Sequence, residues 1–212
     1  MVSSGARERR DLAPRVRPVQ QRAVRTVDLI LETAAELLDE VGVDAFNTNL
    51  LAERANVAVR SVYRYFPNKL AVIVALYENH NEAWEPHFDG AIRRLADPER
   101  NVIEVWEACI DDYVSYLENE VGWAIRRVIQ AIPELREMER RDNDRRARKI
   151  AAGLRTRGAG FDGRGLEAAG RLLIDTCTAA IDDAWSRHGR VPGSAARELK
   201  LMHRSYLANY VD

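Results

Sequence analysis

The chain has 212 residues, of which 46% are apolar and 31% charged, and its formal net charge is −1. This size allows one large or two modest globular domains with a real core. No apolar run approaches the roughly 18 to 20 residues of a membrane-spanning helix, and the Arg-rich N-terminus lacks the apolar stretch of a secretory signal. We therefore expect a cytoplasmic protein with no membrane partner, and the net charge alone argues against a nucleic-acid partner.

The distribution of charge points the other way. Residues 1–25 hold seven Arg against Glu8 and Asp11, a balance of +5, whereas the rest of the chain carries 25 basic and 31 acidic residues, a balance of −6. Pro14, Pro18 and a scarcity of large apolar residues predict a basic, disordered arm over residues 1–23. Such an arm either tracks DNA phosphates or enters a minor groove, or it is only a solubilising tail.

The remaining chain shows the 3.6-residue apolar period almost throughout and no convincing strand alternation, which predicts an all-α fold. The first helix is expected over about 24–41, ended by Gly42. Asn47 is the best candidate for the N-cap of the second helix, with Asp44 and Thr48 as alternatives.

Two short helices, over about 48–55 and 59–65, are joined by a tight turn in which Asn56 is expected to be left-handed. Their apolar contacts come from Leu50, Leu51, Ala55, Val57, Val62 and Phe66. The polar residues of the second of these helices are expected to face outward: Arg60, Ser61, Tyr63, Arg64 and Tyr65. A helix that presents Arg, Ser and Tyr beside a bracing helix is the helix-turn-helix arrangement that enters a DNA major groove.

The string from Ala52 to Lys69, AERANVAVRSVYRYFPNK, resembles the DNA-binding domain of the TetR family of transcriptional regulators, most specifically in its block VYRYFPNK. The resemblance covers about a tenth of the chain. Three positions depart from the family pattern: Asn56 replaces the usual turn Gly, Ala58 replaces the usual Ser or Thr cap, and Arg60 replaces a frequent Gly.

The resemblance implies a three-helix DNA-binding domain over 24–68 and a helical effector-binding and dimerisation domain over 69–212. The residues predicted to contact DNA are Thr48, Arg60, Ser61, Tyr63, Arg64, Tyr65 and Lys69. Arg60, Ser61 and Arg64 are expected to face the bases, because Arg can bridge guanine O6 and N7. The others are expected on phosphates, a role that the resemblance supports for the two tyrosines and Lys69. Alternatively, one tyrosine packs in the core, or Arg64 pairs with Glu53.

Beyond residue 68 the pattern predicts only further helices. A helix capped by Asn68 should start at Lys69 and be kinked or ended by Pro86. Others are expected over about 101–119, between Gly122 and Pro133, and over 134–149. In the last of these, five acids alternate with seven bases, which is typical of a solvated face.

Aromatic residues and two cysteines recur through this second part. Aromatics with a few polar tips suit an apolar or aromatic ligand, although plain core packing gives the same pattern. The residues predicted to line a ligand pocket are Trp84, Phe88, Trp106, Cys109, Tyr113, Tyr116, Trp123 and Cys177. Both cysteines lie in apolar helical patterns and are expected to be buried thiols.

The last two helices are expected to form a dimer interface, or else to be buried within one subunit. Their apolar and small residues recur at spacings of three and four, which packs helices side by side. This predicted interface comprises Leu166, Gly170, Leu173, Cys177, Ala180, Ala184, Leu199, Met202 and Tyr206. The resemblance favours the dimer, because that family pairs through its two C-terminal helices. Ser194 is expected to cap the final helix.

No sequence motif indicates an enzyme, a metal site or a cofactor. A Gly-rich phosphate loop, a G-x-S-x-G elbow and an H-E-x-x-H pair are all missing from the sequence. The expected function is a ligand-responsive transcriptional regulator, a repressor by analogy. It would bind a palindromic double-stranded DNA operator as a homodimer and be released by a small hydrophobic effector. The alternatives are a helical protein-interaction module and an enzyme without recognisable motifs.

Overall fold

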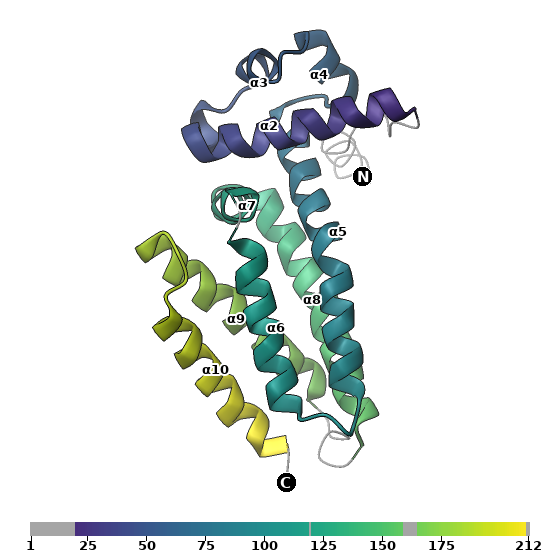
Figure 1. Ribbon diagram of the computed structural model, residues 1–212, viewed down its shortest axis with the longest axis vertical. Helices are drawn as coiled ribbons and strands as arrows, with labels where there is room; N and C mark the ends of the chain where they lie inside the picture. The colour runs from purple at the N-terminus through teal and green to yellow at the C-terminus, as the bar shows by residue number, and fades with distance from the viewer. Residues whose placement is uncertain (1–19, 119, 159–164, 211–212) are drawn as a thin grey trace, which may run out of the picture. The chain divides into compact units, whose positions relative to one another are not determined.

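The computed structural model describes residues 20–118, 120–158 and 165–210, and every regular element in these ranges is a helix (Figure 1). The predicted all-α fold is confirmed. Within the same ranges, no helix is long and apolar enough to cross a membrane. Residues 1–19, which make up most of the expected basic arm, lie outside the described residues.

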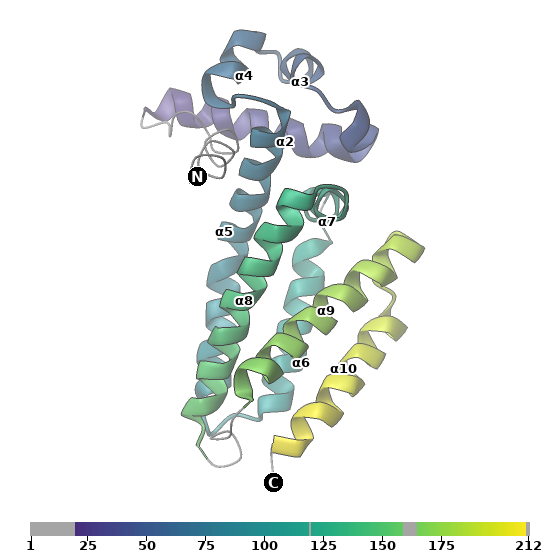
Figure 2. The same cartoon turned by 180° about the vertical axis from the view of Figure 1, so that it is seen from behind.

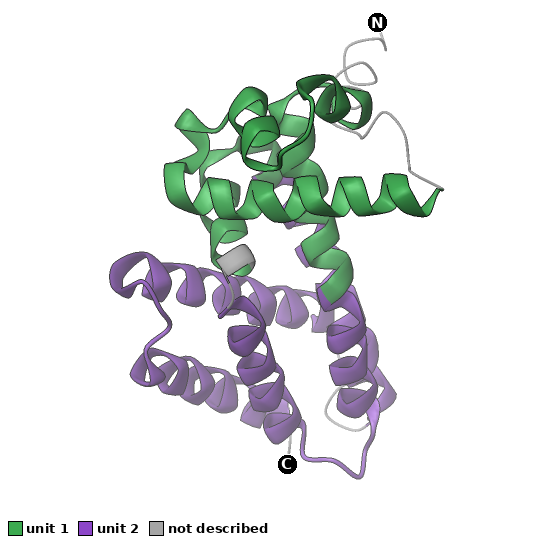
Figure 3. Ribbon diagram, turned by 45° about the horizontal axis from the view of Figure 1, so that its top comes forward, with its two compact units in different colours: residues 1–83, 119–135 green, residues 84–118, 136–212 purple. Residues whose placement is uncertain are grey.

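The chain divides into two compact units (Figure 3). Unit 1 comprises residues 1–83 and 119–135, and unit 2 comprises residues 84–118 and 136–212. Unit 1 is therefore larger than the expected DNA-binding domain over 24–68. The main reason is that α7 (Glu120–Ala131) packs against α2 (Gln21–Ala45).

Unit 1 is built from α2, α3 (Thr48–Arg54), α4 (Val59–Tyr65), α7 and the first part of α5 (Lys69–Ala96). The buried stripe of α2 repeats every three or four residues and comprises Ile30, Leu31, Ala34, Leu37 and Leu38. Its regular helix is interrupted at Gly42, where φ is 71° and ψ is 176°. Phe46, Leu51, Val62 and Phe66 are fully buried beneath α3 and α4.

Unit 2 contains the rest of α5 together with α6 (Val102–Leu117), most of α8 (Pro133–Thr156), α9 (Leu166–His188) and α10 (Gly193–Leu207). A short 3-10 helix, η1 (Ala208–Tyr210), follows α10. Figures 1 and 2 show α9 and α10 side by side and antiparallel, and α10 also packs against α6.

Three expectations about helix ends are wrong. Of the two alternatives expected at Pro86, a kink or an end, the end is wrong: α5 continues to Ala96, because one proline removes one backbone donor and buried Trp84 and Phe88 hold the adjoining turns in place. The helix α8 runs on to Thr156, so Gly153 is helical and packs against Ile92. The last helix begins at Gly193 without a side-chain cap from Ser194.

Candidate functional site

The helix-turn-helix of unit 1 is held by the local contacts that its sequence predicts. The side chain of Asn47 accepts hydrogen bonds from the backbone N–H groups of Asn49 (3.1 Å) and Leu50 (2.9 Å), which caps α3. Asn56 has a φ of 51° in the turn, the left-handed conformation expected of it. The side chain of Asn68 accepts from the N–H of Ala71 at 2.9 Å and so fixes the start of α5.

The exposed face of α4 carries two cations one helical turn apart. Arg60 and Arg64 are exposed, and Ser61 beside them is half-buried. Neither arginine forms an ion pair with another described residue, so the alternative pairing of Arg64 with Glu53 is not observed. The guanidinium of Arg64 instead lies 5.7 Å from the ring centre of Tyr65. Both positive charges are therefore available to an anionic partner.

The two tyrosines of α4 occupy different environments. Tyr63 is 41% exposed, and its hydroxyl lies 2.9 Å from the hydroxyl of Thr48, a bond that ties α4 to α3. Tyr65 is only 5% exposed. The expectation that Tyr65 faces outward is wrong, because it lies three residues after buried Val62 and so shares the inner face of the helix.

Thr48 also differs from its expected role. It is 7% exposed and its hydroxyl is bonded to Tyr63, so it supports that side chain rather than presenting its own oxygen to a phosphate. Lys69 is exposed at the start of α5, where its ammonium group donates to the backbone carbonyls of Val43 (3.3 Å) and Phe46 (3.4 Å).

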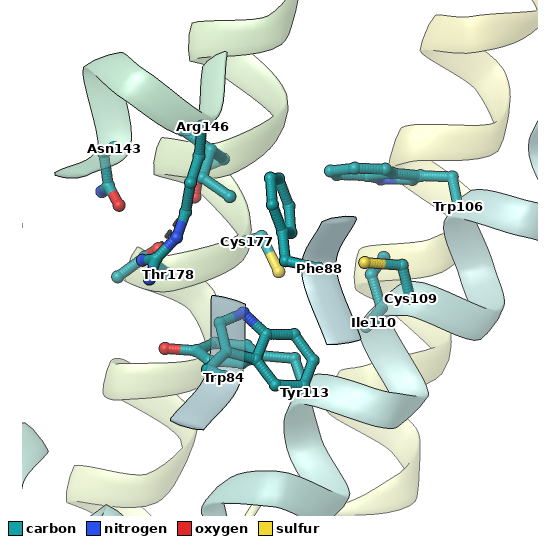
Figure 4. A pocket seen from close by; sticks show the side chains of 11 residues that line it. Trp84, Phe88, Trp106, Cys109, Ile110, Tyr113, Asn143, Arg146, Cys177 and Thr178 are labelled. Carbon is teal, nitrogen blue, oxygen red and sulfur yellow. Dashed lines mark hydrogen bonds between the residues drawn. The ribbon is translucent and has the colours of Figure 1, made fainter. Parts of the chain in front are cut away.

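Unit 2 contains a small cavity with an aromatic wall (Figure 4). Six of the residues predicted to line a pocket do line it: Trp84, Phe88, Trp106, Cys109, Tyr113 and Cys177. Tyr116 packs behind them, with its ring centre 5.1 Å from that of Trp84. Trp123 is an incorrect prediction, because it lies on α7 in unit 1.

The polar side of the cavity was missed by sequence reasoning. Asn143 and Arg146 of α8 and Thr178 of α9 line it, and Figure 4 shows them opposite Trp106 and Cys109. Asn143 and Arg146 are each only 6% exposed, although they belong to the segment expected to be a solvated face. The signal that could have revealed them is their spacing from Ile150, which places all three on one face of α8.

Arg146 belongs to an ion-pair cluster around Glu85 of α5. Glu85 accepts from Arg146 Nη2 at 3.1 Å, from Arg145 at 3.2 Å and from Lys149 at 2.8 Å. Burial by itself would raise the pKa of Glu85, but the hydrogen bond from Lys149 and the charges of the arginines outweigh it and lower that pKa. The carboxylate therefore stays ionised.

A second buried polar group joins the cavity to the C-terminal helices. His203 of α10 is 2% exposed and lies between Trp106 Nε1 (2.9 Å) and the hydroxyl of Thr176 on α9 (2.8 Å). Burial lowers the pKa of His203 to about 4, so its ring is neutral at physiological pH. Among the described residues, no cluster of three or more His, Cys, Asp or Glu could hold a metal ion.

The predicted dimer seam proves to be largely internal. Its buried members are Leu166, Gly170, Leu173, Cys177, Ala184 and Leu199. A Cβ on Gly170 would overlap the backbone carbonyl of Ala147, so this glycine lets α9 approach α8 within one chain. These residues are therefore wrong as an exposed interface, because the strongest apolar stripe of a helix faces its own core.

A different strip of α9 and α10 is left exposed. Leu172 is 45% exposed, Leu201 55% and Met202 47%. Ala180 and Met202 are thus the members of the predicted interface that lie fully on the surface. Tyr206 is half-buried, and its hydroxyl lies 3.2 Å from that of Tyr210.

Comparison with known proteins matches the helix-turn-helix region to one family. Residues 30–76 match the model of "Bacterial regulatory proteins, tetR family". The class A tetracycline repressor protein from transposon 1721 of Escherichia coli is 45% identical over 49 residues. This region of the chain is therefore a DNA-binding domain of the TetR type. The class C repressor of the same organism is 41% identical over 51 residues.

The sequence similarity is confined to one part of the chain. The match to the class A repressor covers 23% of the chain and 23% of the length of that relative. Solved structures extend the likeness in fold to most of the chain. A putative TetR-family regulator from Mesorhizobium loti has a TM-score of 0.69 at 14% identity, covering 89% of this chain and 98% of its own.

A second similar fold is that of SmeT, the repressor of the Stenotrophomonas maltophilia multidrug efflux pump SmeDEF. Its TM-score is 0.68 at 21% identity, and the match covers 88% of this chain and 90% of SmeT. SmeT has also been solved as a complex with triclosan. At these identities the likeness shows that the TetR fold is shared, with its N-terminal helix-turn-helix and helical C-terminal part.

Proposed function

We propose that this protein is a ligand-responsive transcriptional regulator that binds a palindromic DNA operator as a homodimer and acts as a repressor. The observation that carries the proposal is the exposed, unpaired cationic face of α4, set in a helix-turn-helix that matches the TetR family. A cytoplasmic location follows from the proposal, because bacterial DNA lies there.

In this proposal α4 is the recognition helix. Arg60 and Arg64 face base edges, where each bidentate contact to guanine contributes about 1–3 kcal/mol of discrimination. Ser61 assists them, whereas Tyr63 and Lys69 contact phosphates and fix the register. Tyr65 and Thr48 are left out of the direct contacts, because both are buried in the described structure.

Dimerisation is proposed through the exposed strip of α9 and α10 rather than through the buried seam. Leu172, Leu201 and Met202 expose apolar surface that a second copy would cover. The two helix-turn-helix units of such a dimer, related by a twofold axis, would bind half-sites about 34–36 Å apart. A palindromic operator is therefore expected.

The effector is proposed to bind in the cavity of unit 2. The helix α5 supplies Trp84 and Phe88 to this cavity and continues into the sequence of unit 1. Ligand binding would release DNA only if the ligand binds the DNA-free state more tightly, by a few kcal/mol. The triclosan complex of SmeT is a precedent for a small aromatic ligand in this fold.

The deciding experiment measures binding of the purified protein to the DNA upstream of its own gene by fluorescence anisotropy at several salt concentrations. The variants Arg60→Ala and Arg64→Ala should each weaken binding by about tenfold or more. Arg54→Ala is the matched control, because Arg54 already donates to both carboxylate oxygens of Glu40 at 2.8 Å.

If the wild type binds this DNA no better than unrelated DNA, and a genome-wide selection also yields no site, the regulator proposal fails. A helical protein-interaction module is then the better reading. Repression is tested separately with a reporter behind the bound DNA, where deletion of the regulator should raise expression.

A further inference from the structure

We propose that the cavity in unit 2 takes a planar aromatic acid whose carboxylate is received by Arg146. The inference rests on the proposed effector-binding function and adds a chemical class to it. It is carried by the combination of an aromatic wall with one buried cation.

The wall selects a flat, apolar body. Trp84, Phe88, Trp106 and Tyr113 all line the cavity, from α5 and α6. Trp84 and Tyr113 are already in contact, with ring centres 5.1 Å apart and planes tilted by 50°. A ligand ring inserted between these side chains would replace their contacts with one another by similar contacts to the ligand. Each such contact contributes about 0.5–1.5 kcal/mol beyond burial.

The charge at the other end selects an anion. Arg146 is the only charged residue among the described residues that line the cavity, and it is 6% exposed. In such a poorly solvated place a ligand carboxylate is strongly favoured and a ligand ammonium group is repelled. Asn143, also 6% exposed, supplies an amide beside it that can donate to the same oxygens.

The ion-pair cluster allows Arg146 to change partners. Glu85 Oε1 accepts from both Arg145 and Arg146, and Glu85 Oε2 accepts from Lys149. If Arg146 turns to a ligand, Glu85 keeps Arg145 and Lys149, so no carboxylate is left buried without a partner. The usual cost of breaking a buried ion pair is thereby avoided.

The cavity must open to admit the ligand. Its interior now has about 20 Å³ of free space, which is room for a single water molecule. Lining side chains therefore have to move, and association should be slower than a diffusion-limited encounter.

The test compares three matched ligands by isothermal titration calorimetry on the full chain at pH 7.5: 2-naphthoate, 2-naphthylmethanol and 2-naphthylmethylammonium. They share one ring system and differ in charge. We expect naphthoate to bind at least about tenfold more tightly than the alcohol, because its carboxylate forms a hydrogen-bonded ion pair. The ammonium should bind most weakly.

Two variants locate the source of the preference. Arg146→Gln should abolish the advantage of naphthoate over the alcohol, whereas Arg145→Gln should preserve it. Arg145 is the matched control, because it neighbours Arg146 and also binds Glu85 but does not line the cavity. Unchanged affinity for the alcohol shows that the Arg146→Gln cavity is intact. If Arg146→Gln does not fold, Arg146→Lys, which keeps the positive charge, is measured in its place.

The outcomes separate this inference from the proposed function. Equal binding of all three ligands by the wild type, or tighter binding of the ammonium, overturns the aromatic-acid inference and leaves an effector cavity in place. If none of the three binds, both the inference and a hydrophobic effector in this cavity are overturned.

Discussion

The indole Nε1 of Trp106 donates a 2.9 Å hydrogen bond to Nδ1 of His203. Because an indole N–H can only donate, Nδ1 accepts and the ring proton is on Nε2. Nε2 therefore donates to the Thr176 hydroxyl at 2.8 Å, and that hydroxyl donates to the Leu172 carbonyl at 2.6 Å. This chain of bonds links a cavity wall to α10 and α9, next to the exposed strip.

The buried histidine gives a prediction for the pH dependence of stability. Burial lowers the pKa of His203 from its ordinary 6.5 to about 4, so between these values the unfolded chain binds more protons than the folded one. The free energy of unfolding should therefore fall as the pH drops through this window, by up to about 1.4 kcal/mol per pH unit, and His203 should contribute no slope above it. Urea unfolding of the wild type and His203→Gln at pH 4 to 7.5 measures this, and identical slopes would contradict it.

The hydroxyl of Tyr63 has two roles, the hydrogen bond to Thr48 and the proposed phosphate contact, and two variants distinguish them. Thr48→Val removes only the support, whereas Tyr63→Phe also removes the proposed phosphate contact. We expect Tyr63→Phe to weaken binding to all DNA sequences nearly equally, by about 1 kcal/mol, and Thr48→Val to have a smaller effect. Anisotropy titrations on the operator and on scrambled DNA measure both. A changed sequence preference in Tyr63→Phe would assign the hydroxyl to a base instead.

The exposed strip of α9 and α10 gives a test of the proposed dimer. Leu201→Glu and Leu172→Glu should convert the proposed dimer to a monomer, because a carboxylate would be buried without a partner in the interface. Light scattering after size-exclusion chromatography gives the mass directly. Leu29→Glu is the control, since Leu29 is 43% exposed on α2 in unit 1. Dimers that persist in both strip variants would move the interface elsewhere.

Two helical glycines predict opposite effects of the same substitution. Gly170→Ala should destabilise the chain by about 1–3 kcal/mol, because the new methyl group would collide with the backbone of Ala147. Gly90→Ala should stabilise it by about 0.5–1 kcal/mol, since its Cβ would meet only the flexible side chains of Arg94 at 3.6 Å and Arg93 at 3.8 Å. Thermal and chemical unfolding measure both changes, and equal effects would show that the close approach of α9 to α8 is not rigid.

The sequence predicted the parts of the fold that depend on local chemistry. The cap at Asn47, the left-handed Asn56 and the limits of α4 follow from side chains acting on nearby backbone, and all are confirmed. Most residues of the cavity wall were predicted, because large aromatic side chains at helical spacing are usually buried between helices.

The remaining features depend on long-range packing, which periodicity does not encode. The inward face of α8 carries Asn143 and Arg146, whose polarity disguises their burial in the sequence. The dimer seam was predicted from the best apolar stripe of α9, which instead packs inside the chain around Gly170. Trp123 was placed in the wrong unit, because only the tertiary fold shows that α7 packs on α2.

Burial in the cavity wall raises the pKa of Cys109 to about 12. At neutral pH the sulfur is therefore almost entirely in the thiol form, which reacts slowly with peroxide and alkylating agents. Because the buried sulfur is unreactive, the rate at which iodoacetamide labels Cys109 measures how often the helices around it separate.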